Sequence, residues 1–180
     1  MIPSNQYWKG RILMKSFGVK PYLFPMSVYM IGTYNEDGSM DQMAMAWGGI
    51  CAEDMVALNL EEAHKTVANL KARGAFTLAV PGVDTIKECD YLGTASAVDF
   101  PDKCAKAGLH AVKSEHVDAP VVPEFPLTLE CRVIYSQRED IDLLEESIRN
   151  RAYRPSAEGV CDIHTAYYGR IQDAYIIEED

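Results

Sequence analysis

The sequence predicts a mainly β fold with short helical covers, and three observations support this prediction. Strand-forming residues flank the dipeptide Asp37-Gly38, which is a strong hairpin signal within residues 27–49. Residues 127–136 alternate between apolar and polar side chains, as in a half-buried strand. The helical segments between the strands are short, and each is closely followed by a glycine.

The hairpin is expected to run over residues 27–34 and to return over residues 40–49. In the return strand, alternation places Ala44, Ala46 and Gly48 on one face. A face of such small residues admits either a packed helix or a flat ligand, and the sequence leaves both interpretations open.

Further elements follow from turn residues and periodicity. In chain order we expect strands over 55–60 and 76–81, helices over 64–73, 84–92 and 99–107, an extended proline-rich connection over 117–126, and a last strand over 167–177 with Gly169 as a bulge or close-approach point.

A long segment, residues 137–162, separates the last two expected strands. Within it, residues 142–151 have acidic residues early and arginines late, which matches the helix dipole. The last two strands are therefore expected to pair as a hairpin with an inserted helix, and the segment is a candidate lid. We expect one domain over residues 1–180, with residues 1–20 as an N-terminal arm containing one short helix.

Composition excludes several classes of function. A net charge of −10 repels nucleic-acid phosphates, and the basic residues are dispersed. No apolar run approaches the roughly 18 residues that span a membrane. The first residues resemble no signal peptide, so a cytoplasmic location is expected.

The cysteines and histidines indicate no metal site. The five cysteines include no C-x-x-C pair, and the four histidines lack ligand spacing. The cysteines are expected to be reduced and mostly buried, including Cys51. Trp47, which alternates away from Ala46, is expected to pack in the core.

The stretch His64-Lys65-Thr66 is a candidate phosphate site at the start of a helix. Lysine supplies charge, threonine supplies a hydroxyl, and the first helical turn supplies unpaired N–H groups and the positive end of the dipole. In the alternative interpretation Thr66 only caps the helix while Lys65 lies in solvent.

Several motifs occur in order along the chain. They are Tyr34-Asn35-Glu36-Asp37-Gly38, Met45-Ala46-Trp47-Gly48-Gly49-Ile50, His64-Lys65-Thr66 and Asp90-Tyr91-Leu92-Gly93-Thr94-Ala95-Ser96. Their order and spacing resemble the flavin reductase-like family, which includes flavoredoxin. The similarity covers residues 22–136, with a weaker match over 164–178. The resemblance implies an FMN-binding split β-barrel, with six antiparallel strands in a Greek-key-type arrangement and short helices. It also implies a homodimer with the flavin near the subunit interface.

The resemblance assigns residues to an FMN site. An isoalloxazine ring requires a flat apolar slot with backbone donors, and its phosphate requires lysine and helix-terminal amides. The implied residues are Met45, Ala46, Trp47 and Gly48 beside the ring system, His64, Lys65 and Thr66 at the phosphate, and Gly93, Thr94 and Ser96 on the opposite side of the flavin.

This chain departs from the family pattern at two places. Many relatives have Ser-Gly-Arg-Asp where this chain continues from Ser96 as Ala97-Val98-Asp99, so one cationic side chain is missing. Glu61 and Glu62 precede the phosphate motif, and they weaken anion binding unless they point away from it.

The resemblance implies an oxidoreductase that uses NADH or NADPH to reduce flavin or a small acceptor. Two alternatives remain open: a flavoredoxin-like electron-transfer protein without a nicotinamide site, which the missing arginine favours, and a non-catalytic flavin-binding module. Because flavin carries the redox chemistry, no catalytic side chain is required. His164 is a candidate hydrogen-bond or proton donor to the flavin, although a structural histidine bonded to a loop carbonyl is the favoured alternative.

Overall fold

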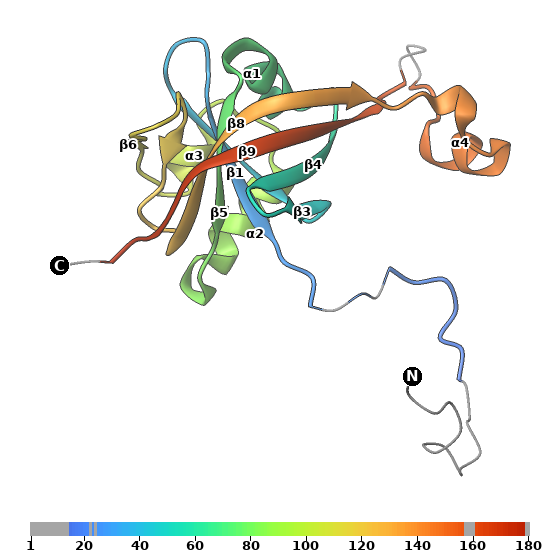
Figure 1. The fold of residues 1–180 in the computed structure, drawn as a ribbon, viewed down its shortest axis with the longest axis horizontal. Coiled ribbons are helices and arrows are strands. Elements are labelled where there is room, and N and C mark those ends of the chain that lie inside the picture. The colour runs from blue at the N-terminus through green and yellow to red at the C-terminus, as the bar shows by residue number, and fades with distance from the viewer. Residues whose placement is uncertain (1–14, 22, 24, 157–160, 179–180) are drawn as a thin grey trace, which may run out of the picture.

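The computed structural model describes residues 15–21, 23, 25–156 and 161–178, and most of these belong to one antiparallel sheet (Figure 1). The seven strands of this sheet are β1 (Tyr29–Tyr34), β2 (Met40–Met45), β3 (Gly48–Ala52), β4 (Met55–Glu61), β5 (Ala75–Val80), β8 (Leu127–Arg138) and β9 (His164–Ile176). Their order is β2-β1-β5-β8-β9-β4-β3. Two short strands, β6 (Val112–Lys113) and β7 (Pro120–Val121), pair separately.

The helices are short, as expected. They are α1 (Lys65–Arg73), α2 (Ile86–Thr94), α3 (Lys103–Lys106) and α4 (Glu146–Ala152), with 3₁₀ turns at Val83–Thr85 and Ile141–Leu143. Helices α1, α2 and α3 all contact β2. Helix α4 lies at the outer end of the ribbon formed by β8 and β9 (Figure 1). The mainly β class with helical covers is confirmed. No helix in the described residues is long and apolar enough to cross a membrane.

The expected return strand over 40–49 is wrong in one respect, because it divides into two strands. Strand β2 ends at Met45, and β3 begins at Gly48 and pairs with β4 instead. At Gly48 an added Cβ would lie 2.4 Å from the Ala57 carbonyl oxygen, so only glycine permits this close approach. The sheet therefore has seven strands where six were expected.

This division shows that the sheet closes on itself. Strands β2 and β3 stand at opposite ends of the strand order, yet only two residues connect them. A two-residue link spans at most about 11 Å between flanking Cα atoms, whereas seven flat strands extend over about 29 Å. The two edges are near each other only if the sheet curls into a barrel.

The hydrophobic core has two parts. Inside the barrel lie side chains that include Ile31, Leu78 and Tyr167. Under the helical cover lie others that include Met30 and Leu92. Because Met30 and Ile31 are neighbours on β1, this strand is buried on both faces.

Most of the structural roles predicted for glycines are confirmed. Gly74 and Gly108 follow α1 and α3 with φ of 64° and 73°, as expected for helix ends. Gly169 is a close-approach point, because an added Cβ would lie 2.4 Å from Phe76 Cζ. The expected helix end at Gly93 is wrong, because α2 continues to Thr94 and Ala95 caps it.

The last two long strands pair as a hairpin with an inserted helix, as expected. Helix α4 starts later than predicted, since residues 141–143 form a 3₁₀ turn in which the Asp140 side chain accepts a hydrogen bond from the Asp142 N–H. The short helix expected within residues 1–20 lies largely outside the described residues. Trp47 and Cys51 are exposed, so their predicted burial is wrong.

Candidate functional site

Two neighbouring cavities lie between β2, α1 and α2. The larger has a volume of about 460 Å³, within the range typical of small-ligand pockets. The smaller has a volume of about 120 Å³ and lies at the start of α1. Gly93 and Thr94 line both cavities, so the two lie side by side at the C-terminal end of α2.

The larger cavity is a mostly apolar slot. Ala44 from β2 and Ala46, just after that strand, form one wall. Ile86, Cys89 and Gly93 form another from α2. An added Cβ at Gly93 would lie 3.2 Å from Ala44 Cβ. The small-residue face therefore packs against a helix and also lines a cavity, which combines the two interpretations that the sequence left open.

The smaller cavity has a cationic end built from α1. His64 caps this helix, and its carbonyl oxygen accepts hydrogen bonds from Val67 and Ala68. Within the described residues, no backbone hydrogen bond occupies the N–H groups of Lys65 and Thr66. These amides and the Lys65 side chain make the cavity suitable for an anion.

Thr66 does not cap the helix, so the alternative interpretation fails for this residue. Its hydroxyl is buried and donates a hydrogen bond of 2.7 Å to Asp41 Oδ2. The Thr66 hydroxyl proton is therefore used in this bond to Asp41. The backbone N–H of Thr66 is the donor that is left for an anion.

Lys103 is a second cation at this cavity, and sequence reasoning missed it. Its side chain is only 4% exposed, yet it lines the same cavity as Lys65. Its ammonium donates a hydrogen bond of 3.1 Å to the Ala95 carbonyl and lies 3.4 Å from Asp41 Oδ1. No sequence signal identified Lys103, because its burial beside Cys104 comes from the packing of α3 against β2.

Of the two acidic residues before the phosphate motif, Glu62 is directed to other partners, whereas Glu61 lies beside His64 of the motif itself. Glu62 contacts the Lys71 ammonium and the Thr165 hydroxyl. Partial burial acts to raise the pKa of Glu62, but these contacts outweigh it and hold the pKa below its ordinary value. The Glu61 carboxylate lies between two imidazoles, 3.7 Å from His64 Nε2 and 3.8 Å from His164 Nε2.

The structure brings most of the predicted site residues together. Met45 and Ala46 line the larger cavity, His64, Lys65, Thr66 and Ser96 line the smaller one, and Gly93 and Thr94 line both. Trp47 and Gly48 are absent from both linings, because the chain leaves β2 for β3 at this point.

His164 lies outside both linings. Its Nδ1 is 3.2 Å from the hydroxyl of Tyr153, which also donates to Glu139. The ring partner is therefore a tyrosine rather than the expected loop carbonyl. Residues 137–156 and 161–162, which are the described part of the inserted segment, line neither cavity. The described residues also contain no cluster suited to a metal ion.

Comparison with known proteins assigns the family. Residues 22–180 match the model of the flavin reductase-like domain. The chain belongs to the flavin reductase-like family. This flavin reductase-like chain is also similar to a solved structure of flavoredoxin from Desulfovibrio vulgaris (Miyazaki F), with 32% sequence identity and a TM-score of 0.72. That match covers 92% of this chain and 78% of the other.

Other solved structures share the fold of this flavin reductase-like chain. Flavoredoxin from Methanosarcina acetivorans has 20% identity and a TM-score of 0.65, with 92% of this chain and 75% of that one covered. A structure named "putative flavin reductase with split barrel domain" from Shewanella frigidimarina NCIMB 400 has 15% identity and a TM-score of 0.67, and the match covers 86% of this chain and 68% of that one. These matches confirm the split-barrel fold. A search of curated proteins found no match.

Proposed function

We propose that this chain binds FMN and acts as an oxidoreductase that reduces flavin or a small acceptor with NADH or NADPH. The observation that carries the proposal is the pair of adjacent cavities, one apolar and one cationic. FMN has the same division, with a flat ring system at one end and a phosphate at the other. The family assignment and the 32% identity with a flavoredoxin support a flavin as the ligand.

The protein's own groups have distinct tasks in this proposal. Ala44 and Ala46 line the apolar slot that takes the ring system. Lys65 and the first amides of α1 bind the phosphate and so fix the ring's position along β2. Bound flavin supplies the redox chemistry by accepting hydride and passing electrons onward.

A titration of the purified protein with FMN tests the binding step. At a hundred times the dissociation constant, bound FMN stabilises the folded state by about 2.7 kcal/mol, which raises the melting temperature. An unchanged melting temperature at saturating FMN contradicts the proposal.

A flavoredoxin-like electron-transfer role is the second candidate. It is supported by the flavoredoxin match and by the absence of an arginine after Ser96. Anaerobic addition of NADH or NADPH to the FMN-loaded protein separates the two roles. Loss of the visible flavin absorbance supports the reductase, whereas reduction only by a ferredoxin-type protein supports electron transfer. A protein that binds FMN but is reduced by neither is a non-catalytic flavin-binding module.

A further inference from the structure

We propose that a third cavity, at the opposite end of α1 from the candidate flavin site, binds a small organic phosphate of the size of a nucleoside monophosphate. This cavity has a volume of about 630 Å³ and lies between the end of α1, the loop that joins β6 to β7, and β8. Arg73 and Gly74 at the C-terminal end of α1 line it, whereas His64 and Lys65 at the start of that helix line the smaller cavity of the flavin site. The two sites are therefore separate, and this inference does not depend on flavin binding.

Two of the cations that line this cavity have no partner in the described part of the protein. Lys113 comes from β6 and Arg132 from β8, and both residues are exposed. Within the described residues, neither side chain takes part in a hydrogen bond or an ion pair. In a chain with 27 acidic and 17 basic residues, two unpaired cations beside one cavity are a local excess of positive charge.

The sheet register places Arg132 beside another cation. Arg132 is directly opposite Arg170 in the pair formed by β8 and β9. Side chains in directly opposite positions stand on the same face of a sheet about 4.5–5.5 Å apart at Cβ, and like charges there destabilise the pair. Arg170 has a counterion, because its Nε lies 3.0 Å from Asp54 Oδ2. An anion in the cavity gives Arg132 the counterion that the described residues do not provide.

The two acidic residues that line the cavity do not cancel this positive charge. Asp118 Oδ2 accepts a hydrogen bond of 2.8 Å from Arg73 Nη1, so this pair is neutral. The Glu115 side chain is 87% exposed and lies 4.0 Å from His116 Nε2. An anion in the cavity therefore meets unpaired cations on β6 and β8 and only one carboxylate that is open to water.

The loop on one side of the cavity is held in place by a buried carboxylate. Glu130 is 1% exposed, and it accepts hydrogen bonds from the N–H groups of Glu115 and His116 at 3.1 and 2.7 Å. The next two N–H groups, those of Val117 and Asp118, have no acceptor within the described residues. Both residues line the cavity, so a loop that is already ordered offers two further donors near the ligand.

The chemistry of these groups favours a phosphate that carries an organic part. Arginine and lysine bind phosphate through charge-assisted hydrogen bonds, and arginine can do so through two N–H groups at once. A volume of about 630 Å³ is in the range of small-ligand pockets and is larger than an inorganic ion requires. Val117 and Val133 add apolar lining for the organic part.

Titration calorimetry with AMP, and with adenosine as the probe without a phosphate, tests the inference. AMP is expected to bind, and adenosine is expected to bind at least about tenfold more weakly, because it makes no charge-assisted hydrogen bond. Lys113→Gln and Arg132→Gln are each expected to raise the Kd for AMP roughly tenfold. Both side chains are exposed, so both variants are expected to keep the wild-type melting temperature.

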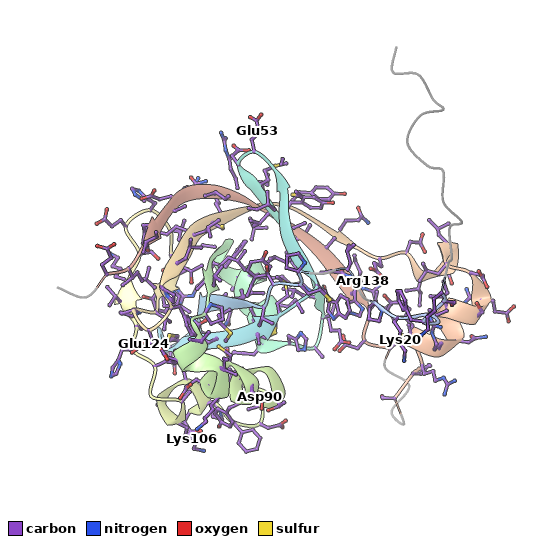
Figure 2. The ribbon with its side chains drawn as sticks, turned by 90° about the horizontal axis from the view of Figure 1, so that it is seen from below. Lys20, Glu53, Asp90, Lys106, Glu124 and Arg138 are labelled. Carbon is purple, nitrogen blue, oxygen red and sulfur yellow. The ribbon has the colours of Figure 1, made fainter. Side chains whose placement is uncertain are left out.

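Two further variants serve as controls for the AMP titration. Arg138 is an exposed arginine on the same strand as Arg132, at its outer end, and does not line the cavity (Figure 2). Arg138→Gln removes the same charge, so it is expected to bind AMP as the wild type does. Lys65→Ala changes the flavin site alone and is also expected to leave the Kd for AMP unchanged.

Four results overturn the inference. They are no binding of AMP, equal binding of AMP and adenosine, an unchanged Kd for AMP in both Lys113→Gln and Arg132→Gln, and a loss in Lys65→Ala as large as that in Arg132→Gln. The last result assigns AMP to the flavin site instead. Failure of the proposed function is distinguishable, since it is measured by the separate titration with FMN.

Discussion

At the scale of single residues, the candidate site has two lysines from different helices, α1 and α3, that line one cavity. Lys65 was recognisable from its motif, whereas Lys103 is brought there by packing of α3 against β2. Glu62, which is close in sequence, contacts Lys71 and Thr165 and so leaves the local field to the cations.

Replacement of Lys65 tests the phosphate site directly. Lys65→Ala is expected to weaken FMN binding by about 1.5–3 kcal/mol, because a charge-assisted hydrogen bond is lost. Titration calorimetry with FMN and riboflavin measures the effect. Riboflavin affinity is expected to stay constant, and an equal loss for both flavins contradicts the assigned role. Lys87→Ala is the control, since Lys87 is exposed on α2 and lines neither cavity.

At the scale of elements, the start of β9 holds the turn between β4 and α1. The Asp162 carboxylate accepts a hydrogen bond from the Ala63 N–H at 3.0 Å, and the Ile163 carbonyl accepts one from the Glu62 N–H at 3.3 Å. Thr165 donates to the Glu62 side chain. The turn that leads into α1 is thus held by residues just before and at the start of β9, 99 positions away in the sequence for the Ala63–Asp162 bond.

The Glu62 contacts predict a pH dependence of stability. Burial acts to raise the pKa of Glu62, but its bonds to Lys71 and Thr165 lower it below the ordinary 4.5. The folded state therefore binds fewer protons, so this stabilisation is present above pH 4.5 and is lost as the pH falls through the folded-state pKa. Glu62→Gln is expected to be less stable at neutral pH and to lose less stability on acidification.

Urea unfolding at a series of pH values measures this difference. Glu53→Gln is the matched control, because Glu53 is exposed at the tip of the β3–β4 turn (Figure 2). If the free energy of unfolding of Glu62→Gln falls on acidification as steeply as that of the wild type and the control, the Glu62 contacts do not cause the pH dependence of stability.

At the scale of the whole molecule, the β8–β9 ribbon projects beyond the barrel and ends in α4 (Figure 1). Figure 2 places Arg138, at the outer end of β8, far from Asp90 and Lys106 on the helical cover. Large apolar side chains on this ribbon are exposed, among them Ile134 and Tyr135. A second copy of the chain is the partner we expect to cover them.

Sedimentation tests this expected homodimer. Stable protein interfaces bury about 1,200–2,000 Å², and their cores are rich in aromatic residues, so Tyr135→Lys is expected to shift the protein toward monomer. Val112→Lys is the control, because Val112 on β6 is 51% exposed, close to the 52% of Tyr135, but belongs to the separate two-stranded sheet. A wild-type monomer, or a Tyr135→Lys variant that dimerises as the wild type does, contradicts the prediction.

The sequence by itself determined the features that depend on neighbouring residues. The hairpin at Asp37-Gly38, the helix ends at Gly74 and Gly108, and the cationic start of α1 all follow from local conformation and capping. Only the tertiary structure decided where the chain breaks between β2 and β3, and that Lys65 and Lys103 line the same cavity. Closure of the sheet and burial of a paired lysine depend on contacts between distant segments, and residue spacing carries no record of those contacts.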